Sequence, residues 1–158
     1  MPSKLHEEQS LKAAAWLRRN GFSVVATNIG AHYSREKIDC VGFRATCSVL
    51  IESKISRADF FADRKKPERG SMGVGLYRFY ITPPGLVTID ELPGGWGLLH
   101  YDGRRVTMVH GPQGNYWPSF DTEHESWDPF KHKVNEDADR GILFSIARRL
   151  SMGKSVLT

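Results

Sequence analysis

The sequence predicts an α/β fold in which helices cover a mixed β-sheet. An amphipathic helical pattern opens the chain, and short segments rich in β-branched residues follow it, separated by turn residues. A helical segment at 56–65 then interrupts the strands before another apolar strand. Strands joined by a tight turn are antiparallel, whereas strands separated by a helix are normally parallel. The sheet should therefore contain both arrangements.

The first helix is predicted at 4–19. Ser3 is a suitable N-cap, and the acidic residues that follow it suit the positive end of the helix dipole. Apolar residues then repeat with helical spacing, at Leu11, Ala13, Ala14, Trp16 and Leu17. The pair Asn20-Gly21 is typical of a helix C-terminus, so the helix should end there.

Three strands are expected next, at 22–29, 38–44 and 48–55. Only residues 45–47 separate the second strand from the third, so these two should form an antiparallel hairpin. The apolar run 49–51 does not alternate with polar residues, which indicates a strand covered on both faces.

A short helix should follow, capped by Ser56 and ended by Pro67. A fourth strand at 76–81 would then be reached by a right-handed crossover. A second hairpin, from 96–101 and 104–110, turns at Asp102-Gly103, and a closing helix is expected at 139–150. Residues 111–137 show no period and are interpreted as a loop. Its tryptophans, Trp117 and Trp127, could stack on bases, but packing over the sheet is favoured.

The bulk composition is that of one globular domain spanning 1–158. The net charge of +4 is compatible with a polyanionic partner but does not require one. The chain has no apolar stretch of membrane-spanning length, so no membrane association is expected. Two cysteines without a CxxC motif favour a reducing compartment, and a cytoplasmic location is therefore expected.

An acid and an acid–lysine pair lie in two successive predicted strands. Asp39 belongs to the second strand, and Glu52 and Lys54 belong to the third. Side chains two apart on a strand point the same way, and Asp39 and Glu52 can face each other across the hairpin. Buried charges of this kind are costly unless something pairs with them, and a divalent metal with a phosphate beside the lysine would do so.

This layout resembles the PD-(D/E)XK nuclease superfamily, with Asp39 as the motif aspartate, Ile38 in place of its proline, and Glu52-Ser53-Lys54 as the D/E-x-K element. The resemblance implies a restriction-endonuclease-like core (helix, three-strand meander, helix, strand) over about 4–82, with residues 83–158 as an added hairpin and closing helix. It implies Mg²⁺, for which Mn²⁺ can substitute, held by Asp39, Glu52 and the carbonyl of Ser53. Lys54 would act with these acids in catalysis.

An acid from the first helix often completes that metal site. Both Glu7 and Glu8 are candidates, and the more core-directed face of Glu7 favours it. The neighbouring His6 could reach the site, although a capping or surface role is favoured for it. The other histidines show no metal-ligand spacing.

A closer likeness is to the MmcB-like DNA-repair branch of the superfamily. It is carried by KISRADFFADRKK at 54–66, PPGLV at 83–87 and ELPGGWGLL at 91–99, and it extends to about residue 110. Related sequences also occur in phages and prophages. The resemblance therefore implies a metal-dependent DNA nuclease of DNA repair or of phage–host DNA metabolism.

Five basic residues cluster around the second helix, at Arg57, Arg64, Lys65, Lys66 and Arg69. They can be read as phosphate contacts or as a solvated helix end. Asp59 and Asp63 on the same helix could hold Arg57, Lys66 or Lys54 in place, or form surface pairs. DNA is the expected partner, while RNA and homodimer formation stay open. The rival hypothesis is a non-catalytic DNA- or partner-binding module on the same fold.

Overall fold

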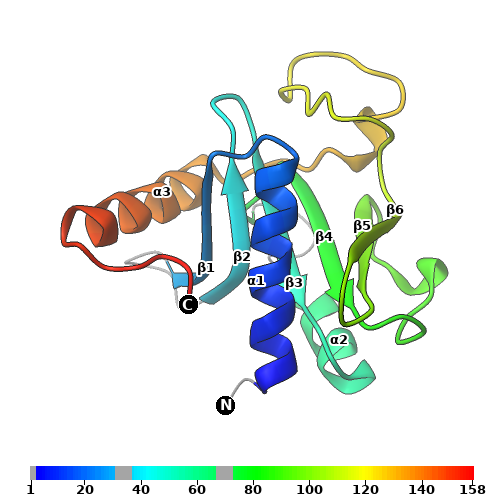
Figure 1. The fold of residues 1–158 in the computed structure, drawn as a ribbon. Coiled ribbons are helices and arrows are strands. Elements are labelled where there is room, and N and C mark those ends of the chain that lie inside the picture. Colours follow the sequence, from blue (N-terminus) through cyan, green and yellow to red (C-terminus); the bar gives the residue numbers. More distant parts are fainter. Residues whose placement is uncertain (1–2, 31–36, 67–72) are drawn as a thin grey trace.

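A computed structural model describes residues 3–30, 37–66 and 73–158. The chain forms an α/β structure, drawn in Figure 1. Its elements are α1 (Lys4–Arg19), β1 (Val24–Gly30), β2 (Lys37–Phe43), β3 (Ser48–Ser53), α2 (Arg57–Arg64), β4 (Tyr77–Thr82), η2 (Ile89–Glu91), β5 (Trp96–Tyr101), β6 (Val106–His110), η3 (Asp128–Phe130) and α3 (Glu136–Ser151). Within the described ranges, none of these helices has the length and apolar content needed to cross a bilayer.

The six strands form one mixed sheet in the order β1-β2-β3-β4-β5-β6. The pairs β1/β2, β2/β3 and β5/β6 are antiparallel, and β3/β4 and β4/β5 are parallel. The predicted mixed sheet and the predicted order of helices and strands are therefore confirmed. The crossover through α2 sets β4 parallel to β3, and the carboxyl ends of these two strands meet at one edge of the sheet.

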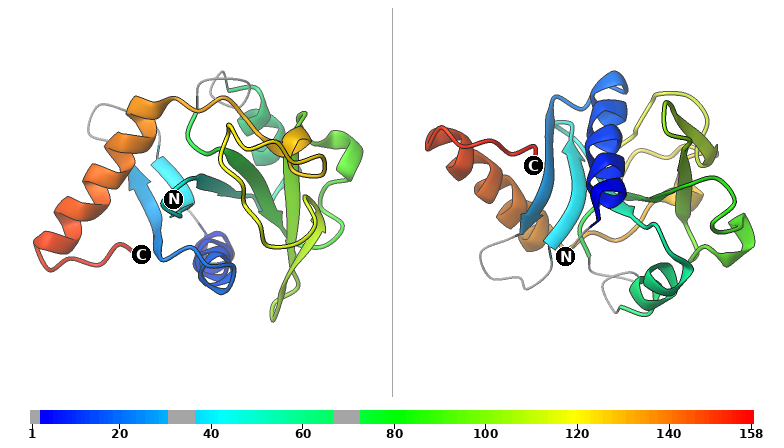
Figure 2. Two further views of the ribbon diagram at one scale, coloured as in Figure 1. Left: turned by 90° about the horizontal axis from the view of Figure 1, so that it is seen from above. Right: turned by 60° about the horizontal axis from the view of Figure 1, so that its bottom comes forward.

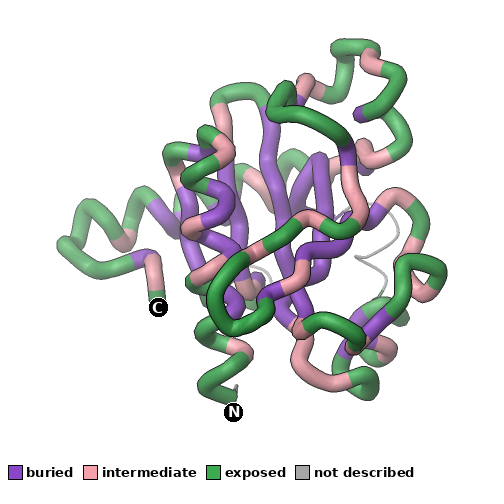
Figure 3. Tube along the Cα trace, turned by 45° about the vertical axis from the view of Figure 1, so that its right-hand side comes forward, coloured by how far each residue is buried: buried purple, intermediate pink, exposed green. Residues whose placement is uncertain are grey.

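Each face of the sheet has its own core. On one face, α1 packs with Ala13 and Leu17 against side chains of the central strands. On the other face, Phe60 of α2 and Ile142 and Ile146 of α3 cover the sheet. Figure 2 shows α1 on the opposite side of the sheet from α2 and α3, and Figure 3 shows the central strands buried between these layers. All six residues of β3 are buried, as the uninterrupted apolar run predicted.

The segment after β6 is irregular, as expected, but its tryptophans are core residues. Trp117 and Trp127 are 3% and 0% exposed, and their ring centroids lie 4.9 Å apart. Tyr77 of β4 contacts both rings edge-on. The structure therefore supports the packing interpretation over base stacking for both side chains.

Several predicted element boundaries differ from the observed ones, among them the starts of β1, β6 and the closing helix and the end of β3. The closing helix begins at Glu136, three residues before the predicted start, because the side chain of Asn135 accepts a hydrogen bond from the backbone N–H of Ala138 and caps it. The third strand ends at Ser53, two residues before its predicted end, and Lys54 lies just beyond it.

Candidate functional site

The two acids singled out in the sequence lie side by side where β2 and β3 pair. Cys40 pairs with Ile51, so the next residues outward on the two strands are Asp39 and Glu52. The Glu52 side chain is 2% exposed and hydrogen-bonds to the Asp39 carboxyl group. The expected juxtaposition of these two carboxyl groups across the hairpin is therefore present.

Asp39 is held from three directions. Its Oδ2 accepts a hydrogen bond from the backbone N–H of Ser53 at 2.9 Å and lies 3.3 Å from Nε2 of His6. Burial raises the pKa of Asp39, but the hydrogen bonds with His6, Glu52 and the Ser53 N–H outweigh burial and hold that pKa below its ordinary value. The hydrogen bond between His6 and Asp39 also raises the pKa of His6 above its usual value, although burial opposes this change.

The His6 side chain thus contacts Asp39 directly, which the sequence analysis did not favour, while its backbone N–H takes part in the cap by donating to Oγ of Ser3 at 3.2 Å. Its position in the first turn of α1 brings its ring to Asp39, while its backbone carbonyl accepts a hydrogen bond from Oγ of Ser53 at 3.0 Å. The signal available in the sequence was the adjacency of His6 to the candidate acids.

The two candidate acids of α1 point to different places. Glu7 lines a small pocket together with His6, Asn28 and Asp39. Glu8 instead accepts a hydrogen bond from the Tyr101 hydroxyl of β5 at 3.0 Å. Of the two, Glu7 is therefore the one that the fold places beside Asp39.

Asn28 adds an unusual backbone feature to that pocket. It lies between the paired residues Thr27 and Ile29 of β1, across from Asp39 of β2, and has a φ of 50°. Positive φ is uncommon for residues other than glycine and clusters at functional positions. The sequence pattern gave no indication of this residue.

Gln9 is a buried polar residue that the sequence analysis missed. It is 0% exposed, and its amide nitrogen lies 3.0 Å from Oγ of Ser53, 3.2 Å from the carbonyl oxygen of Lys54 and 3.2 Å from that of Ile81. A single side chain of α1 thereby joins the ends of β3 and β4. The available signal was a glutamine on the same helical face as Ala13 and Trp16.

Lys54 is held by an acid of α2. Its Nζ lies 3.2 Å from Oδ1 of Asp63, whose side chain is 1% exposed. The same carboxylate accepts a hydrogen bond from the Tyr80 hydroxyl at 2.7 Å and contacts Nζ of Lys66 at 3.4 Å. Of the alternatives left open for Asp63, the structure shows the one in which it holds Lys54 and Lys66.

Two of the basic residues predicted to contact nucleic acid make intramolecular contacts. Arg57 forms a bidentate pair with Glu91, at 3.0 and 2.6 Å, and Nη1 of Arg64 donates to the backbone carbonyl of Glu91 at 2.7 Å. Both guanidinium groups also lie over the ring of Phe61. These contacts fasten α2 to the segment around η2.

The remaining residues of that basic cluster differ from one another. Lys65 is exposed at the end of α2, and Lys66 is exposed but paired with Asp63. Arg69 lies outside the described residues. All four described members of the cluster are exposed, and Lys65 differs from the others in that its side chain forms no hydrogen bond or ion pair within the described residues.

The protein ligands available to a metal are two carboxylates and backbone oxygens. Within the described ranges, no group of three or more His, Cys, Asp or Glu side chains is arranged to hold a metal ion. The adjacent Asp39 and Glu52 are nevertheless the oxygen donors that Mg²⁺ prefers, and Mg²⁺ commonly keeps several waters when few protein ligands are present. The donor set therefore fits a partly hydrated Mg²⁺ ion.

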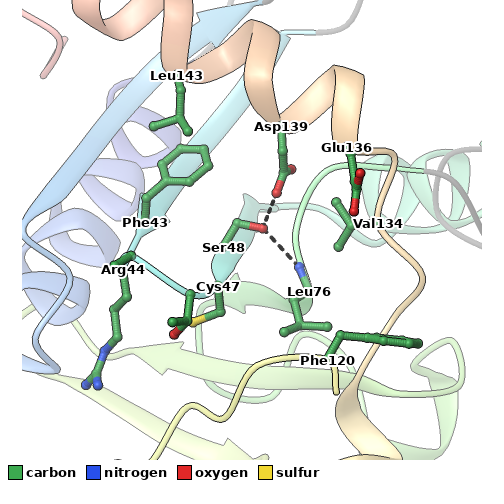
Figure 4. Close-up of a pocket in the computed structure, with 12 residues that line it drawn as sticks. Phe43, Arg44, Cys47, Ser48, Leu76, Phe120, Val134, Glu136, Asp139 and Leu143 are labelled. Atoms are coloured by element: carbon green, nitrogen blue, oxygen red, sulfur yellow. Dashed lines mark hydrogen bonds between the residues drawn. The ribbon is translucent and has the colours of Figure 1, made fainter. Parts of the chain in front are cut away.

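A separate pocket lies at the other end of β3 (Figure 4). It encloses about 270 Å³, and Asp139 of α3 projects into it, where it accepts a hydrogen bond from Oγ of Ser48 at 2.5 Å. Asp139 also accepts one from the N–H of Gly75 at 3.2 Å. Burial raises the pKa of Asp139, although these hydrogen bonds oppose the change. This carboxyl group ties α3 to the starts of β3 and β4.

Comparisons with known proteins place the chain by its fold. No protein-family model matches the sequence, and a search of curated proteins finds no match. The solved structure of the SPO1766 protein of unknown function from Silicibacter pomeroyi is similar along the whole of both chains, with a TM-score of 0.62 and 20% sequence identity. At this identity the similarity establishes a shared α/β fold alone.

Proposed function

We propose that the protein is a Mg²⁺-dependent nuclease that hydrolyses phosphodiester bonds in DNA. The observation that carries the proposal is the contact between the buried Glu52 carboxyl group and the partly exposed Asp39 carboxyl group, with Lys54 immediately beyond the end of the Glu52 strand. The resemblance to the PD-(D/E)XK superfamily assigns Asp39 and Glu52 to metal binding and Lys54 to catalysis. It also suggests a restriction-endonuclease-like core and a pathway of DNA repair or phage–host DNA metabolism.

The carboxyl pair supports a cation site on electrostatic grounds. Two carboxyl groups in contact repel each other when both are ionised, and the repulsion grows as they are removed from water. A divalent cation would offset that repulsion. In this proposal Asp39, Glu52 and the Ser53 carbonyl would hold Mg²⁺ (or Mn²⁺), and Glu7, which lines the same small pocket as Asp39, would support the site.

The remaining chemistry can be divided among the residues of the site. The bound metal would activate water and offset the charge of the phosphate. Lys54 supplies a fixed positive charge where negative charge grows in the transition state. The Ser53 N–H and His6 keep the Asp39 carboxylate in place. Lys65 and Lys66 would contact the DNA backbone and give salt-dependent affinity.

The direct test is cleavage of single-stranded, nicked and branched DNA, with RNA in parallel, in Mg²⁺, in Mn²⁺ and in EDTA. We expect metal-dependent cleavage that falls by about 100-fold or more in Asp39→Asn and in Lys54→Met. Asp59→Asn is the matched control, since it removes a carboxylate from the exposed face of α2 and should cleave like the parent. Parent-like cleavage by Asp39→Asn would overturn the assignment.

The rival function is DNA or partner binding without catalysis. It is favoured by the internal pairing of Lys54 with Asp63, which satisfies that charge without a substrate. Thermal unfolding with and without Mn²⁺ separates the two, because a metal that binds only the folded state raises its stability. Metal stabilisation that is lost in Glu52→Gln supports the nuclease, whereas metal-independent DNA binding without cleavage supports the rival.

A further inference from the structure

Two lysine ammonium groups contact the single carboxylate of Asp63. Lys54 and Lys66 both contact its Oδ1, at 3.2 and 3.4 Å, while the Tyr80 hydroxyl donates to its Oδ2. A single cation is enough to neutralise one carboxylate. One of the two lysines can therefore leave without exposing Asp63 to the penalty of an uncompensated buried charge.

The two lysines are not equivalent. The Lys54 side chain is 13% exposed, and Lys54 directly follows Ser53, whose N–H donates to Oδ2 of Asp39 at 2.9 Å. The Lys66 side chain is 49% exposed and sits beyond the end of α2. Lys54 is thus the cation positioned to turn toward a substrate, and Lys66 is the one positioned to remain.

Asp63 itself cannot easily follow a departing lysine. Its partner Tyr80 is buried, stacks on Trp96 with ring centroids 4.4 Å apart, and meets Phe60 edge-on at 4.9 Å. Phe60 and Asp63 lie on the buried face of α2, so the helix packing also fixes the carboxylate. Lys54 is therefore paired with a carboxylate whose position is fixed by packing.

We infer that Asp63 is a positioning residue that holds Lys54 beside the Asp39–Glu52 pair, and that Lys66 neutralises Asp63 when Lys54 turns to a substrate phosphate. The inference rests on the proposed function for the identity of that phosphate. It adds a supporting acid and an exchange of cations to the site, with no covalent step. Without Lys66, Lys54 would have to leave a buried carboxylate unpaired, so its movement would be disfavoured.

The kinetic test compares two neighbouring lysines. Lys65→Gln and Lys66→Gln each remove one positive charge from the same helix end, so both should raise KM for DNA. Lys66→Gln alone should also lower kcat, by about 10-fold, and Lys66→Arg should restore it. In an Asp63→Asn background, Lys66→Gln should lower kcat no further. A Lys66→Gln variant that changes only KM, as Lys65→Gln does, overturns the inference.

A second measurement does not depend on cleavage. The side-chain ammonium signals of Lys54 and Lys66 can be followed by NMR, assigned with Lys54→Gln and Lys66→Gln. A phosphorothioate oligonucleotide with Ca²⁺ serves as the uncleaved ligand. We expect DNA to shift the Lys54 signal. The Lys66 signal should still differ between the parent and Asp63→Asn when DNA is bound, which would show that Lys66 remains in contact with Asp63.

The outcomes of this measurement separate the two proposals. A shifted Lys54 signal in a protein that cleaves no substrate upholds the positioning role and ends the nuclease proposal. An unchanged Lys54 signal in a protein saturated with DNA overturns the positioning role, whatever the protein cleaves. Absence of any DNA complex at low salt overturns both.

Discussion

At the scale of single residues, burial can change the protonation of a side chain, and His132 shows this most clearly outside the candidate site. Its Nε2–H donates to the carbonyl of Gly95 at 2.9 Å, and its ring makes a T-shaped contact with that of Trp96, with centroids 6.1 Å apart. Burial, reinforced by the charge of Arg78, lowers the pKa of His132 to about 4, although the hydrogen bond to Gly95 opposes this. The ring is therefore neutral in the folded protein at neutral pH.

This neutral ring should make stability fall in mild acid. In the unfolded chain the pKa of the histidine is near 6.5, so between pH 6.5 and 4 the unfolded state binds the extra proton and is favoured as pH falls. The free energy of unfolding should be about 2 kcal/mol lower at pH 5 than at pH 8. Urea unfolding of the parent and of His132→Gln at both pH values checks this, since the variant lacks that loss. Parallel changes in the two proteins would contradict it.

At the scale of elements, the fully buried side chain of Gln9 links α1 to the sheet. Gln9 reaches from the buried face of α1 to Ser53 and to the carbonyl oxygens of Lys54 and Ile81. These groups lie at the ends of β3 and β4, where the strands stop pairing with each other. The glutamine therefore fixes the helix relative to the strand that carries Glu52.

Replacing this glutamine should loosen the contact between α1 and the sheet. We expect Gln9→Leu to lower the free energy of unfolding by about 2–4 kcal/mol, because buried acceptors lose their donor. Urea denaturation measures the loss. Gln113→Leu, which makes the same replacement at an exposed position, should stay within about 0.5 kcal/mol of the parent. Equal unfolding midpoints for the two variants would show that Gln9 is not a structural link.

The elements themselves were largely predictable, because their patterns are local. Helical spacing, the Ser3 cap and the Asn20-Gly21 stop gave α1 its observed limits. The short turn between β2 and β3 gave their antiparallel pairing, and with it the contact between Asp39 and Glu52. These inferences need only strand alternation and turn length, both of which can be read from neighbouring residues.

The residues that complete the site were not predictable in the same way. Gln9 and His6 contact Ser53 and Asp39, which lie 44 and 33 positions away in the sequence. The adjacency of His6 to the candidate acids was a weak signal, and the neighbours of Gln9 do not identify its partners. Arg57 and Arg64 look like a basic patch in the sequence, but their contacts with Glu91 depend on how the chain returns after β4. Long-range packing decides such contacts, whereas local periodicity does not.

At the scale of the molecule, the irregular segment after β6 completes the core that α1 begins. Trp117 and Trp127 join Trp16, Phe22 and Tyr77 in one aromatic cluster on the α1 face of the sheet. This segment therefore acts as a covering layer, although it contains no α-helix or strand. Aromatic clusters of this kind contribute both buried area and edge-to-face contacts.

Truncating Trp127 should detach that covering layer. We expect Trp127→Ala to cost about 3–5 kcal/mol of unfolding free energy, because it empties the space beside Tyr77 and Trp117. Trp127→Phe should cost much less, since the indole N–H that it removes is buried and has no hydrogen-bond partner among the described residues.

Urea denaturation measures both variants, and limited proteolysis locates the effect. Trp127→Ala should become sensitive within 111–126 while its other segments stay protected, because α1 contacts β1, β2, β3 and β4 directly. The base-stacking alternative makes the opposite forecast, namely parent-like stability with weakened binding to single-stranded DNA. That result would return Trp127 to the nucleic-acid interface and remove the segment after β6 from the core.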